Sequence, residues 1–168
     1  MRTDMYWIGG PWAGRLAIAP RPRGGDWLNE EVREWQRAGA QILVSLLTAD
    51  ESAQLGLDEE ESECRVRQME FVSFPVIDRG VPASHPVYLR LLADLTERLT
   101  DGRTVLIHCR QGIGRAGLIA IGLLVASGVA FETAIDRVAK ARGQPVPETI
   151  EQRHWIEEHA KGSFTQAA

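Results

Sequence analysis

The feature that most constrains this chain is the segment VLIHCRQGIGRAGLIA, residues 105–120. It passes from an apolar run typical of a buried strand, through a glycine-rich loop, into the most hydrophobic helix pattern of the sequence. Gly112 and Gly114 can adopt positive φ, which lets successive N–H groups turn inward at the start of the following helix. The segment therefore predicts a loop that binds an oxyanion.

Two side chains give that loop its chemistry. Cys109 begins it, where backbone amides and the helix dipole would stabilise the thiolate, the nucleophilic form of cysteine. Arg115, six positions later, can offer a planar fork to two phosphate oxygens. The structural alternative is a buried core cysteine beside a helix-capping arginine. A chance match to His108, Cys109, Gly112 and Arg115 together is about one in a thousand at ordinary residue frequencies.

The rest of the chain alternates between strand and helix patterns. Strands are expected over residues 5–8, 16–19, 41–47, 71–77 and 104–108, with an edge hairpin from the first two. Helices are expected over residues 26–38, 57–69, 86–99 behind a Ser84 cap, 115–127, 131–142 and about 148–160. This order predicts one α/β domain over residues 1–168, with a mostly parallel central sheet flanked by helices and the glycine-rich loop between the last strand and a buried helix.

The composition of the chain limits the classes of molecule that it is expected to bind. The formal charge of −4 lacks the Lys/Arg excess of a nucleic-acid or membrane-surface protein, so neither partner is expected. The N-terminus shows no signal peptide, and two cysteines outside any disulfide or metal spacing indicate a reducing compartment. We expect a cytoplasmic monomer without a cofactor. No metal is expected either, because His85, His154 and His159 form no ligand set.

Gly112 to Gly117 also spells G-x-G-x-x-G, the dinucleotide-binding fingerprint. That fold requires a further strand after the helix and an acidic residue about 20 positions on. Here the next element is another helix, with Asp136 inside it, and too little chain remains for the rest of the sheet. The dinucleotide interpretation is therefore rejected.

The stretch HCRQGIGRAG resembles the signature of the cysteine-dependent protein tyrosine and dual-specificity phosphatases, His-Cys-x5-Arg followed by Ser or Thr. The order of elements is most similar to the kinase-associated phosphatase branch, including FPVIDRGVPAS and TIEQRHWIEEH. The resemblance implies metal-free hydrolysis of phosphate monoesters through a phosphocysteine. Cys109 would be the nucleophile and Arg115 the phosphate clamp, while His108 would orient the loop.

The leaving group needs a proton from a carboxylic acid on a loop across the pocket. Position alone offers Asp50 and Asp78, and the resemblance favours Asp78. In the second step the family uses glutamines to place water, a role that Gln152 could take. A solvent-facing helix position is the alternative for Gln152.

Two positions depart from the family. Glu148 stands where relatives carry the Gln of a Gln-Thr-Ile motif, and Ala116 stands where they carry a hydroxyl that stabilises the departing thiolate. We therefore expect slow breakdown of the phosphocysteine. A module that binds phosphoresidues with weakened catalysis is the alternative function, and sulfur transfer or arsenate reduction on a similar loop is a second.

The remaining loop residues inform the substrate. Arg110, Gln111 and Ile113 lack the lysine pair of phosphoinositide phosphatases, so a lipid substrate is not expected. The chain also shows no aromatic recognition segment like that of strict tyrosine phosphatases, which indicates a shallow cleft open to phosphotyrosine and phosphoserine or phosphothreonine. Residues 108 and 110–114, together with Ala116 and Gln152, form the expected substrate-binding set.

Two further features are given structural interpretations. Cys64 is interpreted as structural, with a redox partnership with Cys109 left open. The acidic run 58–63 is interpreted as a solvated helix start.

Overall fold

The computed structural model describes residues 4–160. Five strands and seven α-helices follow in order: β1 (Tyr6–Ile8), β2 (Arg15–Ala19), the 3-10 helix η1 (Gly25–Trp27), α1 (Leu28–Arg37), β3 (Ile42–Ser45), α2 (Ala49–Gln54), α3 (Glu60–Val66), β4 (Glu70–Ser73), α4 (His85–Thr100), β5 (Thr104–His108), α5 (Gly114–Ala126), α6 (Phe131–Arg142) and α7 (Ile150–His159).

The strands form one sheet in the order β1-β2-β5-β3-β4. Only β1 and β2 pair antiparallel, while β2 with β5, β5 with β3 and β3 with β4 are parallel. The mostly parallel sheet and the edge hairpin are thus confirmed. Because β3, β4 and β5 run in one direction, the chain leaves all three at the same edge of the sheet, where open α/β sheets bind ligands.

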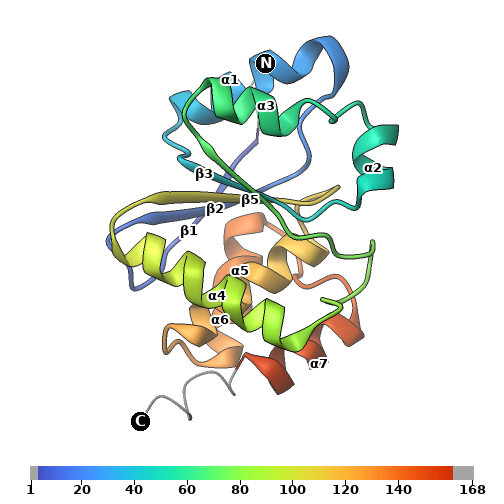
Figure 1. Ribbon diagram of the computed structural model, residues 1–168. Coiled ribbons are helices and arrows are strands. Elements are labelled where there is room, and N and C mark those ends of the chain that lie inside the picture. The colour runs from blue at the N-terminus through green and yellow to red at the C-terminus, as the bar shows by residue number, and fades with distance from the viewer. Residues whose placement is uncertain (1–3, 161–168) are drawn as a thin grey trace.

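Helices cover both faces of the sheet: α1, α2 and α3 lie on one side and α4 to α7 on the other (Figure 1). Alternate residues of β5 feed the two cores, since Leu106 packs with the first group and Val105 and Ile107 with the second. All thirteen residues of α5 are buried, as expected of the apolar helix after the loop. Within residues 4–160, no helix combines the length and apolar character needed to cross a bilayer.

Two element predictions were wrong in detail. The helix expected over residues 57–69 is only α3, and it is preceded by α2, which was not predicted. A capping box starts α2: the Thr48 side chain accepts from Glu51 N, and the Glu51 side chain accepts from Thr48 N. The strand expected over residues 71–77 ends at Ser73, although Phe74 and Val76 still donate backbone bonds to Ser45 and Leu46.

Candidate active site

The loop between β5 and α5 forms a cradle closed by a glycine. Gly112 has φ of 70°, and a Cβ there would lie 2.5 Å from the carbonyl carbon of Ala19 at the end of β2. Only glycine meets both demands. Its N–H donates to Cys109 Sγ at 3.3 Å, so the backbone already turns toward the sulfur.

Three carbonyl groups of the cradle accept hydrogen bonds from groups outside the loop. Arg142, in the last turn of α6, donates from Nε to Gly112 O at 3.0 Å and from Nη2 to Gln111 O at 3.2 Å. Arg21 N donates to Arg110 O at 3.2 Å. Because each of these carbonyls points outward, the N–H group of the same peptide unit points inward, where an oxyanion would accept. Sequence reasoning missed Arg142, since it reads as an ordinary basic residue at a helix C-terminus.

Arg115, at the start of α5, is buried and fixed by a carboxylate from α2. Its Nη1 and Nη2 donate to the two Glu51 oxygens at 2.8 and 3.0 Å, and Nη1 also donates to Val76 O at 2.9 Å. Burial raises the pKa of Glu51, but the hydrogen bonds from Arg115 and Thr48 outweigh it, so its pKa lies below the usual value of 4.5. Glu51 was not a predicted site residue.

Asp78 approaches the same guanidinium from the opposite side. Its Oδ1 accepts from Arg115 Nη2 at 3.1 Å, and its side chain is 53% exposed. It lies in a turn closed by Gly80 N donating to Ile77 O at 2.8 Å, with Arg79 at a positive φ of 62°. The competing candidate, Asp50, is exposed in the first turn of α2 and does not line the pocket.

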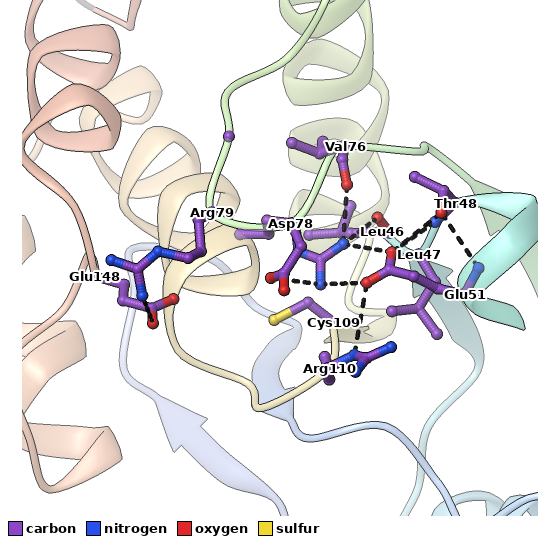
Figure 2. Close-up of polar contacts among 12 residues, drawn as sticks. Leu46, Leu47, Thr48, Glu51, Val76, Asp78, Arg79, Cys109, Arg110 and Glu148 are labelled. Carbon is purple, nitrogen blue, oxygen red and sulfur yellow. Dashed lines mark hydrogen bonds and ion pairs between the residues drawn. The ribbon is translucent and has the colours of Figure 1, made fainter. Parts of the chain in front are cut away.

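A cavity of about 130 Å³ lies where these groups meet, with eight residues on its walls: Asp78, Arg79, Cys109, Arg110, Gln111, Gly114, Arg115 and Glu148. Figure 2 shows Asp78 next to the Cys109 sulfur, with Glu51 on one side and the Arg79–Glu148 pair on the other. The pocket thus unites the expected nucleophile, clamp and acid with three of the residues expected to bind substrate.

The other expected binding residues stand behind the pocket. Gly112 packs on the end of β2, Ile113 packs against the core, and Ala116 is fully buried in it. No hydroxyl is therefore available at position 116.

His108 also lies outside the pocket and pairs with an unpredicted carboxylate. Its Nε2 lies 2.6 Å from Glu60 Oε1, both side chains are buried, and Nδ1 lies 3.4 Å from Cys109 O. Glu60 belongs to the acidic run 58–63, so interpreting that whole run as solvated was wrong. A charged residue is buried where a specific partner meets it, and His108 comes from 48 residues away.

Gln152 is fully buried, so the solvent-facing alternative was wrong. Its Oε1 accepts from Glu148 N and Thr149 N, both at 3.1 Å, as part of the cap of α7. Its Nε2 donates to Gly80 O at 3.1 Å. The amide therefore joins α7 to the turn that carries Asp78.

Cys64 contrasts with Cys109. It is buried in the core on the other face of the sheet, packed with Trp35, Leu43 and Leu106. Burial, with nearby Glu60 as a further cause, raises its pKa to about 12. Among residues 4–160, no three His, Cys, Asp or Glu side chains gather as metal ligands would.

Similarities to known proteins are found both in sequence and in fold. Human cyclin-dependent kinase inhibitor 3 is 34% identical over 86 residues, covering 50% of this chain and 40% of that protein. The chain spans less than half the length of the first curated relatives that it matches.

Two solved structures share nearly the whole fold. A kinase-associated phosphatase with its catalytic-site cysteine replaced by serine has a TM-score of 0.89 at 21% identity, covering 97% of both chains. Tk-PTP in the active form has a TM-score of 0.78 at 28% identity, covering 96% of this chain and 99% of that one. The family model PTP-SAK, described as Swiss Army Knife protein, DSP-PTPase phosphatase domain, matches residues 12–168, and the chain therefore belongs to this phosphatase-domain family.

Proposed function

We propose that the protein hydrolyses phosphate monoesters through a phosphocysteine on Cys109, without a metal. The observation that supports this most directly is that one pocket contains a cysteine in an amide cradle, a buried arginine and a carboxyl group on a turn above them. A site that only binds phosphate needs neither the nucleophile nor the acid.

The hydrogen bonds of Arg115 leave one edge for the phosphoryl group. Glu51 accepts one hydrogen from Nη1 and one from Nη2, and Val76 O accepts from Nη1 as well, whereas Nε has no partner among the described residues. The second Nη2 hydrogen donates to Asp78. A phosphoryl group that takes the Nε–Nη2 edge replaces Asp78 there, which frees the Asp78 carboxyl for the bridging oxygen.

In the first step the Cys109 thiolate attacks phosphorus as the bond to the leaving oxygen breaks. Protonated Asp78 gives its proton to that oxygen, which departs as an alcohol or phenol. The inward N–H groups of the cradle and Arg115 stabilise the charge on the phosphoryl oxygens.

In the second step water attacks the phosphocysteine and the Asp78 carboxylate takes its proton. The S–P bond breaks, so inorganic phosphate and the Cys109 thiolate are released. Ala116 offers no hydroxyl to the departing thiolate, and the Gln152 amide is occupied by backbone groups. This step is therefore the slow one.

We propose phosphotyrosine and phosphoserine or phosphothreonine of proteins, or small aryl phosphates, as substrates for a cytoplasmic monomer. None of the eight residues lining the pocket is aromatic, so no ring in its wall selects for phosphotyrosine. Arg79 and Arg110 lie at the pocket, where they can meet acidic groups on the substrate.

The test is hydrolysis of para-nitrophenyl phosphate in EDTA by the wild type, Cys109→Ser and Asp78→Asn. We expect metal-independent turnover that Cys109→Ser abolishes and Asp78→Asn reduces by about 10² or more, the usual contribution of a general acid. Tight binding of vanadate without turnover by the wild type would instead establish a module that binds phosphoresidues.

A further inference from the structure

We propose that Glu148 and Arg79 form a latch that positions the Asp78 turn, so that Asp78 stays over the pocket after substrate takes its place on Arg115. The inference rests on the proposed function. It gives a positioning role to Glu148, which stands where relatives in the family carry a glutamine.

The latch begins with an ion pair directly beside the acid. Arg79 Nη1 donates to Glu148 Oε1 at 2.8 Å, and the two residues are 69 positions apart in the chain. Figure 2 shows this pair next to Asp78 at the pocket. A glutamine at position 148 could accept a hydrogen bond from Arg79 but would carry no charge to attract it.

A second contact holds the same turn. Gln152 Nε2 donates to Gly80 O, so α7 and its cap contact both residues that follow Asp78. Gln152 is itself fixed, because its Oε1 accepts from Glu148 N and Thr149 N. The turn, with its left-handed Arg79, is therefore held at two consecutive residues, and neither contact involves the Asp78 side chain.

The start of α5 makes room for this arrangement. A Cβ on Gly114 would lie 2.9 Å from Glu148 Oε2 and 3.0 Å from both polar atoms of the Gln152 amide. Glu148 thus fills the space between the Asp78 turn and the cradle. The latch therefore sets the distance between the Asp78 turn and the phosphate-binding cradle through contacts with one element, the N-terminus of α7.

The contact between Asp78 and Arg115 cannot hold the Asp78 turn over the pocket during catalysis. A phosphoryl group on the free edge of Arg115 displaces the Asp78 carboxylate, which removes the hydrogen bond that holds this side chain among residues 4–160. With Glu148 and Gln152 in place, the backbone stays within reach of the leaving oxygen. Without them, the turn can move away from the pocket at that moment.

The enzymatic test compares kcat/KM for phenyl phosphate, whose leaving group needs the proton most, with that for para-nitrophenyl phosphate. Since kcat/KM ends at the first irreversible step, slow phosphocysteine breakdown does not enter. Glu148→Gln and Arg79→Gln should each lower the phenyl phosphate value about fivefold, the upper effect of an exposed ion pair, and the other value less than twofold. The double variant should lose no more than either single one.

Salt and a matched control separate the latch from a general loss of charge. Raising ionic strength should lower the phenyl to para-nitrophenyl ratio in the wild type and leave it unchanged in both variants. Glu61→Gln removes an exposed ion pair with Arg65 on α3, which lies on the opposite face of the sheet from α7 (Figure 1), and should leave the ratio unaltered. Equal losses on both substrates, or additive losses in the double variant, would overturn the latch.

Amide hydrogen exchange gives a readout that needs no turnover. The Gly80 N–H, which donates to Ile77 O, should exchange faster in both variants and at the wild-type rate in Glu61→Gln. Unchanged exchange in Glu148→Gln would refute the latch even if the enzyme is active. If the wild type hydrolyses neither substrate, the proposed function fails while the exchange result still decides the latch.

Discussion

Glu51 and Asp78 contact the same guanidinium, yet the structure holds them in opposite ways. Glu51 is almost buried, is gripped by both terminal nitrogens of Arg115 and accepts further bonds from Thr48. Asp78 makes one contact at 3.1 Å from a half-exposed turn. One carboxylate fixes the arginine, and the other is free to leave it.

The difference shows how one pocket can combine a rigid and an adjustable wall. A phosphate clamp works when its fork is aligned before substrate arrives, because no reorganisation is then needed. A group that carries a proton to the leaving oxygen and later takes one from water must instead be able to move. We expect substitution of Glu51, on the rigid wall, to lower kcat/KM more than substitution of residues that support the pocket from behind.

The largest effect should follow from Glu51→Gln. The substitution leaves Arg115 buried with one neutral acceptor in place of a bidentate carboxylate, so we expect kcat/KM to fall about 10²-fold and stability to fall by about 3 kcal/mol, as when a buried pair is broken. The measurements are steady-state kinetics and urea unfolding. Glu31→Gln is the matched control, because Glu31 is similarly buried and pairs with Arg23 away from the pocket. It should lose stability but not activity.

Acid should erase the stability difference between the wild type and Glu51→Gln. The folded-state pKa of Glu51 is lowered, so its contribution is fully present above the unfolded pKa of about 4.5 and is lost as pH falls through the folded pKa. Urea unfolding of both proteins from neutral pH to below pH 4 measures this. A difference that stays constant over that range would mean that Glu51 is not held as a carboxylate by Arg115.

Removal of an outer support of the cradle should cost less. Arg142→Met keeps an apolar stem but removes the donors to Gln111 O and Gly112 O. We expect about a tenfold fall in kcat/KM and a matching loss of vanadate affinity, since the inward N–H groups are no longer fixed. Arg137→Met on the same helix removes only a bond to Gly9 O and serves as the control. Equal effects of the two variants would show that the cradle holds its own shape.

Ala116→Ser tests the slow second step and should change rates only several-fold. If a hydroxyl at position 116 stabilises the departing thiolate, as the family resemblance implies, breakdown of the phosphocysteine should accelerate. The wild type's burst of para-nitrophenol, equal to enzyme concentration, should then shrink and the steady rate should rise. Ala120→Ser is the control: it places a hydroxyl one turn later in the same buried helix. If the wild type shows no burst, breakdown is not rate-limiting.

The parts of this site that sequence reasoning reached are local or follow a simple period. The cradle lies within ten consecutive residues, and the strands that bring Asp78 to the same edge carry plain apolar patterns. Glu51, Glu60 and Arg142 escaped because their partners lie 64, 48 and 30 residues away. Read along the chain, each is a charged residue in a helix whose first or last turn suits its charge. Only the packed fold shows that these charges are buried or directed at the cradle.

The smallest effect is expected at Cys64, which lies in the core on the other face of the sheet. With a pKa of about 12, Cys64 remains a thiol at neutral pH, and a thiol is a poor nucleophile. Iodoacetamide at neutral pH should therefore label Cys109 in the folded protein and leave Cys64 unlabelled until urea unfolds the chain. Cys64→Ala should keep kcat/KM within about twofold, since such a change only trims a core side chain. Peptide mass spectrometry after mild peroxide would reveal a disulfide between the two cysteines, and finding one would show that the sheet does not keep them apart.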